Sequence, residues 1–501
     1  MYLCAKIMNK SWQSFLPYLC LGIFTITVWY FPLFYQLDRL YLTLWDESRL
    51  SVNAVEMLRS GDWFITTYQG QPDHWHTKPP LMIWLQVLSL KLLGINELAI
   101  RLPAALAGLA TISYIFNFIR RQTGEPFIAF AGSVLLLTAN GFVGYHITRN
   151  GDTDALLCFF TTVMVLESYL FATTVRPQHF IIASIAVIGA MMTKGVQGLI
   201  FLPPVVLFVL GHRAVWAFLT KKVFWFMLLM VITIPASYYF LRNQYDPGYW
   251  QAVVENELWG RFGKALEGHQ HPFDYYFELM YKDLFFPHWA VGLVSLAVLF
   301  LSKNPFLKAG LYLIAVTLFY GLIISTAQTK LEWYSAPVYP LWVVGIALVF
   351  LVRFQLWEQR QKYLMLCMAF GLGFLYQQKM RQIIDAKESD MPAILFGPYL
   401  KQVAQERKEI TRMTVYTDDY IAAMLFYQAR IQADYGKDFP IIRYAKDDLA
   451  KGSITLPIGE IISFRDDPMK PYIDSRYEYQ ELFHYERFYT VKITAKKSKD
   501  D

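Results

Sequence analysis

Long apolar stretches recur along the chain up to about residue 378 and are separated by short polar loops. A helix needs about 20 apolar residues to cross a bilayer core of roughly 30 Å. We predict eleven membrane spans, at about residues 13–35, 98–119, 126–145, 154–175, 179–193, 197–211, 222–241, 285–302, 308–327, 334–352 and 360–377. The pattern therefore predicts a polytopic α-helical membrane protein.

The stretch 79–94 is apolar but short for a crossing, and it begins with Pro79-Pro80, which suits the start of a helix. Counting it as a span would reverse the orientation of every later loop. We predict an interfacial or re-entrant helix on the outer side, and a full crossing here stays the open alternative.

From about residue 379 the chain becomes rich in charged residues. Met413–Tyr416 and Ile461–Phe464 are runs typical of strands, and helical periodicity is present around 398–409 and 420–430. We therefore predict a transmembrane domain at 1–378 with outer loops at 36–97 and 242–284. A small C-terminal α/β soluble domain is predicted at 379–501, ending in a solvated tail from Lys496.

Composition supports this division. Of 501 residues, 55% are hydrophobic and 17% are charged, whereas about a quarter of a soluble protein is charged. The net charge of +6 is spread over short loops, which indicates orientation and excludes nucleic-acid binding. The four cysteines show no CxxC spacing, so neither a disulfide framework nor a zinc knuckle is indicated.

Basic residues set the predicted orientation. With the N-terminus inside, the inner connections carry Arg120-Arg121, Arg176, His212-Arg213, Lys221-Lys222, Lys303, Lys308, Arg353, Arg360 and Lys362. This agrees with the excess of Lys and Arg in cytoplasmic loops. We predict a multi-pass protein of the cytoplasmic (inner) membrane with its C-terminal domain on the extracytoplasmic, periplasmic side.

The same topology brings the other notable polar residues to the outer face. They are Asp46, Glu47, Arg49, Asp73, His74, His76, Lys78, His146, Arg149, Asp152, Asp154, Lys194, Glu255, Asn256, Glu257, Arg261, His269, His271, Lys330, Glu332 and Tyr334. Lys and Arg can neutralise a phosphate, and a carboxylate can take a proton from an attacking hydroxyl. This face suits an anionic, lipid-linked substrate.

Each candidate also has a purely structural interpretation. Asp46 could cap the helix that follows it, and Asp154 could only interact favourably with a helix dipole. Lys78 and Lys194 could extend along an apolar surface to reach the interface. Histidines 74, 76, 269 and 271 could bind a divalent metal ion or be ordinary surface residues.

The order of several motifs resembles the GT-C type glycosyltransferases that use polyprenyl-phosphate sugars. This group includes the protein O-mannosyltransferases and the aminoarabinose transferases that modify lipid A. The resemblance covers about residues 40–345. The motifs are Trp45–Arg49, Glu56–Trp63, Lys78–Leu81 with Trp84, Glu97–Pro103, Arg149–Asp154, Thr193–Gly195, Arg261-Phe262, Lys330, Trp333-Tyr334 and Pro337.

The resemblance implies roles for individual residues. Asp46 would be the central catalytic acid, with Glu47 and Arg49 beside it, and Asp154 would be the second acid. The implied substrate-binding residues are Arg49, Lys78, Arg149, Lys194, Arg261, Lys330 and Tyr334, and among them Lys78, Arg261 and Tyr334 would contact the lipid phosphate. Thr77 stands where the aminoarabinose subgroup often has a metal-binding glutamate, so the metal ligands stay unknown.

The expected function is transfer of a sugar from an isoprenoid (undecaprenyl-type) phosphate donor to an envelope acceptor, which is lipid A, a glycan or a protein. A transporter or flippase for a lipid-linked or anionic solute is the main alternative, but it predicts charge near the middle of paired spans. A scaffold whose tail binds a partner is a second alternative. The sugar, the acceptor, the oligomeric state and the role of the tail stay open.

Overall fold

The computed structural model describes residues 28–144, 146–259, 268–301, 305–349, 371, 374 and 391–497. The chain forms two compact units. The first contains the described residues up to Leu37, His74–Met82 and those between Arg101 and Asp385. The second joins Asp38–Asp73 and Ile83–Ile100 to the C-terminal region. The predicted boundary between 378 and 379 lies outside the described residues.

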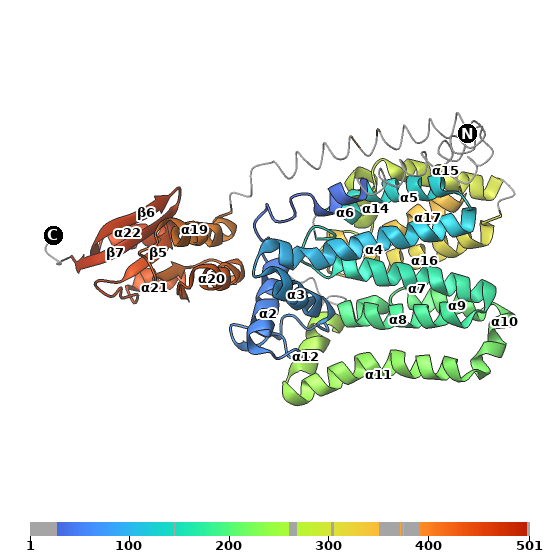
Figure 1. Cartoon of the computed structure of the whole chain (residues 1–501), viewed down its shortest axis with the longest axis horizontal. Helices are drawn as coiled ribbons and strands as arrows, with labels where there is room; N and C mark the ends of the chain where they lie inside the picture. The colour runs from blue at the N-terminus through green and yellow to red at the C-terminus, as the bar shows by residue number, and fades with distance from the viewer. Residues whose placement is uncertain are drawn as a thin grey trace, which may run out of the picture. The chain divides into compact units, whose positions relative to one another are not determined.

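The first unit is a bundle of helices, several of which run lengthwise beside one another (Figure 1). Its elements are α4 (Glu97–Thr123, of which the part from Arg101 belongs here), α5 (Pro126–Leu137), α6 (Asn140–Val143), α7 (Asp154–Thr174), α8 (Pro177–Lys194), η1 (Gly195–Leu199), α9 (Leu202–Leu210), α10 (Arg213–Trp216), η2 (Ala217–Thr220), α11 (Lys222–Tyr245), α12 (Tyr249–Val253), η3 (Val254–Trp259), α14 (Tyr275–Leu279), η4 (Met280–Leu284), α15 (His288–Leu301), α16 (Leu307–Thr326), η5 (Glu332–Ser335) and α17 (Val338–Val349).

Within the described residues, five helices are long and apolar enough to span a membrane, or up to seven if each bent helix pair counts as one span. The polytopic membrane fold is thus confirmed, while the number of eleven spans stays a prediction. The predicted span 360–377 and most of 13–35 lie outside the described residues. The stretch 79–94 forms α3 (Leu81–Leu93), whose 13 residues extend only about 20 Å at 1.5 Å per residue.

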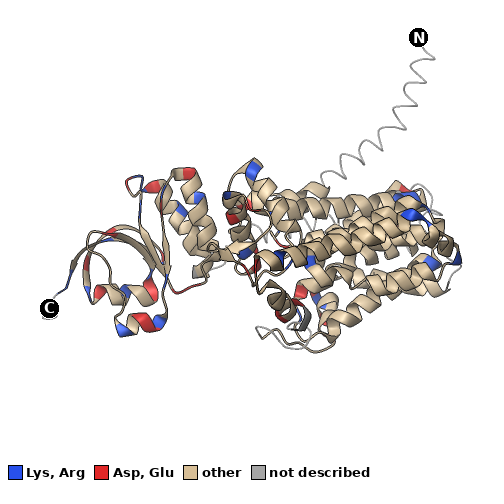
Figure 2. Ribbon diagram, turned by 90° about the horizontal axis from the view of Figure 1, so that it is seen from below, with Lys and Arg blue, Asp and Glu red and all other residues tan. Residues whose placement is uncertain are grey.

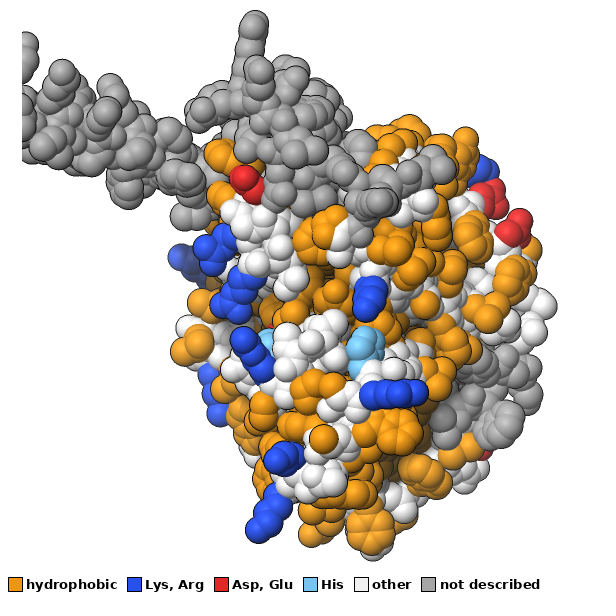
Figure 3. Space-filling view, turned by 90° about the vertical axis from the view of Figure 1, so that its right-hand side faces the viewer, with side chains coloured by type: hydrophobic (Ala, Val, Ile, Leu, Met, Phe, Trp, Pro, Cys, Tyr) orange, Lys and Arg blue, Asp and Glu red, His pale blue; other side chains and the backbone are white. Residues whose placement is uncertain are grey.

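Charged side chains are rare along these helices and gather near their ends (Figure 2). One end of the bundle faces the viewer in Figure 3, and Lys and Arg dominate its charged side chains. The predicted inner connections Arg120-Arg121, Arg176, Arg213 and Lys221-Lys222 are exposed at helix ends. We call this set the basic end.

The second unit has a helical part from the first predicted outer loop and a C-terminal α/β part. The loop contributes α2 (Asp46–Ser60), the β1–β2 hairpin (Thr67–Tyr68, Gln71–Pro72) and most of α3. The C-terminal part contains α19 (Pro392–Glu406), β3 (Thr414–Thr417), α20 (Ala422–Tyr435), β4 (Ile441–Arg443), α21 (Lys446–Lys451), β5 (Ile461–Arg465), α22 (Asp466–Asp474), β6 (Tyr477–Tyr485) and β7 (Phe488–Lys496).

The C-terminal sheet has the strand order β4-β3-β5-β7-β6, in which β3 is parallel to β4 and β5, and β7 is antiparallel to its neighbours. Helices α19 and α20 share a core with one face, and α21 and α22 with the other. The predicted α/β class is confirmed. Strand β7 ends at Lys496, and the predicted tail after it lies almost entirely outside the described residues.

Helix α20 also packs on the first outer loop. Leu50, Ala54 and Met57 line one side of α2 at helical spacing and share a buried core with Phe426 and Tyr427 of α20. Arg59 of α2 donates a hydrogen bond to the Ala429 carbonyl at 3.2 Å. The C-terminal domain and the first loop therefore fold as one body.

Candidate active site

The start of α7 and the end of α8 hold a buried ion pair. Lys194 Nζ lies 2.6 Å from Asp154 Oδ1, and both side chains are almost completely buried. The other carboxylate oxygen, Asp154 Oδ2, has no hydrogen-bond partner among the described residues. The Lys194 ammonium also lies 5.2 Å above the Tyr334 ring. Three predicted site residues thus converge, and one buried carboxylate oxygen can still accept a hydrogen bond.

A second buried pair precedes α7. His146 Nδ1 lies 2.9 Å from Asp152 Oδ2, and the imidazole stacks on Trp333 with ring centroids 3.7 Å apart. Burial raises the pKa of Asp152, but the hydrogen bond and charge of His146, together with Lys194, hold that pKa well below its usual range. Asp152 is therefore a carboxylate at any physiological pH. His146 has a φ of 65°, a conformation that is uncommon for non-glycine residues and frequent at functional sites.

Lys78 is held in a polar segment of the first unit. Its Nζ lies 3.6 Å from Glu257 Oε1, and the Thr77 hydroxyl donates to the same oxygen at 3.1 Å. The Tyr249 hydroxyl donates to the Thr77 carbonyl at 2.6 Å. The threonine that replaces the expected glutamate therefore helps to position the carboxylate that pairs with Lys78.

The support of this segment was not identified from the sequence. Arg242, near the end of α11, is completely buried, stacks 4.0 Å above the Tyr249 ring and donates to the Tyr238 hydroxyl at 2.9 Å. Its partner Asp246 also hydrogen-bonds His74 Nε2 at 2.7 Å. In the sequence, the position of Arg242 as a lone arginine near the end of an apolar span was the signal that could have identified this support.

Two predicted substrate-binding residues anchor the backbone instead of lining an open surface. Arg149 donates to the carbonyls of Pro32 at 3.0 Å and Tyr35 at 2.8 Å. Lys330 Nζ donates to the Ala327 carbonyl at 2.7 Å, and burial lowers the pKa of Lys330. Their role in substrate binding stays a prediction. Arg261 lies outside the described residues.

In the second unit, Asp46 and Glu47 begin α2. The residue before them, Trp45, has a φ of 68°, and no side chain caps the helix by a hydrogen bond. The capping interpretation of Asp46 is therefore wrong. Glu47 Oε2 accepts hydrogen bonds from the Thr43 amide and hydroxyl at 2.8 and 3.0 Å. Glu47 thus fixes the loop, while no described residue donates a hydrogen bond to the Asp46 carboxylate.

Arg49 lies one turn further along α2 and is rigidly held. Its guanidinium makes two hydrogen bonds to Asp73, at 2.8 and 2.7 Å, and it lies 4.3 Å from the Tyr68 ring centroid. Asn53 donates to the same carboxylate at 3.0 Å. Since both oxygens of Asp73 are engaged, Asp73 orients Arg49 and is itself no candidate base.

The histidines considered as metal ligands lie in separate environments. His74 pairs with Asp246, and His271 stacks on Tyr275 with ring centroids 4.0 Å apart. The His269 carbonyl accepts a hydrogen bond from the Lys330 amide at 3.0 Å. Among the described residues, none of histidines 74, 76, 269 and 271 belongs to a group of three metal-ligating side chains.

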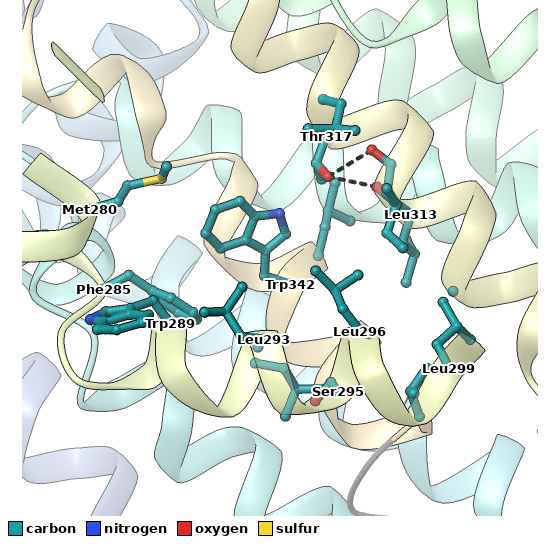
Figure 4. Close-up of a pocket in the computed structure, with 18 of the residues that line it drawn as sticks. Met280, Phe285, Trp289, Leu293, Ser295, Leu296, Leu299, Leu313, Thr317 and Trp342 are labelled. Carbon is teal, nitrogen blue, oxygen red and sulfur yellow. Dashed lines mark hydrogen bonds between the residues drawn. The ribbon is translucent and has the colours of Figure 1, made fainter. Parts of the chain in front are cut away.

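An apolar cavity of about 530 Å³ lies in the first unit between α14–η4–α15, α16 and α17. Figure 4 shows Trp289, Leu293 and Leu296 of α15 pointing into it opposite Trp342 and Leu313. Gly292 and Gly345 lie in its wall, and a Cβ at Gly292 would meet no atom within 4 Å. The cavity suits a hydrocarbon chain.

Comparison with known proteins agrees with these features. A family described as dolichyl-phosphate-mannose-protein mannosyltransferase matches residues 77–239. An undecaprenyl phosphate-α-4-amino-4-deoxy-L-arabinose arabinosyl transferase of Edwardsiella ictaluri is 28% identical over 63% of this chain and 57% of its own length. An uncharacterized protein of Aquifex aeolicus is also 28% identical, over 61% of this chain and 59% of its own length. The chain thus spans somewhat over half the length of these relatives.

The solved structure of ArnT from Cupriavidus metallidurans in the apo state matches with a TM-score of 0.66 and 16% identity, covering 95% of this chain and 98% of that one. The same ArnT bound to undecaprenyl phosphate gives 0.65, with 94% and 97% covered. An oligosaccharyltransferase from Archaeoglobus fulgidus gives 0.51 at 12% identity, with 94% and 72% covered. These findings confirm the predicted fold class and the resemblance stated from the motifs.

Proposed function

Because the chain has the fold and the sequence signature of the GT-C type glycosyltransferases, we propose that it transfers a sugar from an isoprenoid phosphate donor to an envelope acceptor. The observation that carries this proposal is the polar cluster around Asp154 and Lys194. Burying a charge is expensive unless it is paired. Since the rest of the bundle contains little charge, we infer that these buried charged groups take part in the reaction.

The proposed mechanism is direct displacement at the anomeric carbon with inversion. Asp46 takes the proton when the acceptor is a hydroxyl, and it orients the acceptor when that is itself a phosphate. Lys78, already held by Glu257, neutralises the leaving phosphate. Negative charge develops on this phosphate during transfer, and in a site that excludes water a positioned cation stabilises it strongly. Asp154 Oδ2, which lacks a described partner, accepts a hydrogen bond from a sugar hydroxyl.

The apolar cavity supports a lipid-linked donor. Its walls are mostly hydrocarbon and aromatic, and the polar groups among the lining residues are the hydroxyls of Tyr281, Ser295 and Thr317 and the indole N–H groups of Trp289 and Trp342. Thr317 donates its hydroxyl proton to the Leu313 carbonyl at 2.7 Å within α16, so this proton is not available to a polar ligand. We assign the cavity to part of the isoprenoid chain.

We further propose that the chemistry takes place outside the cytoplasmic membrane, on the periplasmic side. The first loop and the C-terminal domain share one core, so both lie on the same side of the membrane. An even number of crossings must then separate them. The Lys and Arg excess at the basic end supports a cytoplasmic location for that end of the bundle.

A divalent metal ion stays part of the proposal. Metal-ligating histidines commonly hydrogen-bond a carboxylate through their second ring nitrogen, and His146 and Asp152 have this arrangement. Both residue types are ligands of Zn²⁺ and Mn²⁺. A bound ion would stabilise negative charge on a donor oxygen. Elemental analysis of the purified protein, compared with His146→Ala, tests this assignment.

The decisive experiment uses membranes that contain the full-length protein and a radiolabelled undecaprenyl-phosphate sugar. Transfer releases free lipid phosphate and moves label to the acceptor, whereas a flippase or a scaffold does neither. We expect Asp46→Asn to abolish release at unchanged protein level. Glu409→Gln, an exposed acid of the C-terminal domain, is the matched control. Full activity of Asp46→Asn would refute the assigned base.

A further inference from the structure

The second unit contains a contact between the C-terminal domain and the segment that carries Asp46. The Tyr420 ring stacks on the Trp45 ring, with centroids 4.8 Å apart and planes inclined by 27°. Trp45 directly precedes Asp46 and has a positive φ. A strained backbone persists only where its surroundings hold it. Tyr420 is the ring that covers Trp45, whose surface is still 62% exposed.

Tyr420 also faces Arg49. The Arg49 charge favours the ionised hydroxyl of Tyr420, yet burial outweighs it and raises the pKa of Tyr420. The hydroxyl therefore stays protonated at physiological pH. Arg49 is already fixed by Asp73 and Tyr68. Two side chains of the Trp45–Arg49 segment thus meet one tyrosine of the C-terminal domain.

The turn that carries Tyr420 is itself rigid. It follows β3, and Arg465 at the end of the neighbouring strand β5 clamps both acids of the turn. The Arg465 guanidinium lies 3.0 Å from Asp418 and 2.9 Å from Asp419. The Asp419 amide donates to the Thr417 hydroxyl at 3.1 Å. Loops at the carboxyl ends of parallel strands are where such α/β folds place functional residues.

We propose that Tyr420 is a positioning residue, through which the C-terminal domain holds the Trp45–Arg49 segment in the conformation required for transfer. This inference rests on the proposed function and extends it, because it gives the C-terminal domain a part in the reaction. Tyr420 acts on Trp45 and Arg49 and needs no contact with the substrate.

The kinetic test compares Tyr420→Leu and Tyr420→Phe with the wild type in the full-length enzyme. An aromatic pair stabilises the conformation that contains it, and its loss changes the equilibrium constant for that conformation roughly 2- to 12-fold. We expect Tyr420→Leu to lower kcat about 10-fold with little change in the KM of the donor, and Tyr420→Phe to restore most of it. Tyr485→Leu, at an exposed tyrosine of the same domain, should have wild-type kinetics. A wild-type kcat in Tyr420→Leu would overturn the inference.

A second measurement needs no substrate. Hydrogen exchange of the amides of residues 45–49 should become about 2- to 10-fold faster in Tyr420→Leu and stay unchanged in Tyr485→Leu. Unchanged exchange in Tyr420→Leu would overturn the inference even if kcat fell. Failure of the wild type to transfer any isoprenoid-linked sugar would instead refute the proposed function, and the exchange data separate the two cases.

Discussion

The two ends of the helical bundle in the first unit use charge in opposite ways. At the basic end, Arg120 and Lys222 are exposed to solvent and belong to a group dominated by one sign. At the other end, Asp154 and Lys194 are buried, paired with each other and flanked by an aromatic ring. Exposed charges orient a membrane protein at little energetic cost, whereas buried charges are costly and therefore indicate function.

The comparison predicts that single substitutions at the buried end have large effects and those at the basic end small ones. Lys194→Met should have the largest. It leaves the Asp154 carboxylate buried without its cation, which costs about 3–5 kcal/mol. We expect this loss in the free energy of unfolding in mixed micelles, together with loss of transfer. The double variant Lys194→Met/Asp154→Leu should regain most of the stability but no activity. A stable, active Lys194→Met would contradict the comparison.

Arg242→Met should come next. It removes the hydrogen bond to Tyr238 and the charge beside Asp246, at a cost of about 2–3 kcal/mol for a buried charged partner. Because these groups support the segment that carries Lys78, the KM of the donor should rise. Arg242→Lys keeps the charge but loses the planar stack on Tyr249. An unchanged donor KM in Arg242→Met would argue against this support.

Asp152→Asn should cost about 2 kcal/mol, since it removes a charge-assisted hydrogen bond from His146. The folded-state pKa of Asp152 is depressed, so its contribution is complete above the unfolded value of about 3.9 and is lost as pH falls through the lower folded value. The titration of Asp152 itself should therefore contribute no change to the difference in Tm between wild type and variant from pH 5 to pH 8. A difference that changes within this window would show that another group titrates there.

The smallest effects are expected at the basic end. Arg120→Gln and Lys222→Gln should each change the free energy of unfolding by less than about 0.5 kcal/mol, as is usual for surface positions. Transfer should stay within about 2-fold of the wild type. Replacing the whole exposed set should instead perturb membrane insertion, because orientation depends on the summed Lys and Arg bias. Glycosylation-site mapping of the loops measures that outcome.

Local patterns of apolar and polar residues were enough to predict several helices and strands. Helices α7 and α8 were predicted within about two residues, because Asp154 and Lys194 delimit long apolar runs. Strands β3 and β5 were also found. The hairpin of β6 and β7 was missed, because β6 has a single buried residue and so shows no clear apolar strand pattern.

Long-range partners left no local signal. The apolar stripe of α2 was visible, but nothing near it indicates that α20 covers it. The roles of Arg242 and Tyr420 depend equally on partners distant in sequence. Pairing between remote segments is decided by packing, which a single sequence does not display.

The hydrogen bond between Arg59 and Ala429 joins residues 370 positions apart. A ribosome adding roughly 5–20 residues per second needs about 20–70 s to cover that interval. During this time the apolar side of α2 lacks α20, which has not yet been synthesised. Until α20 is made, the apolar side of α2 therefore offers a binding surface to chaperones and quality-control proteases.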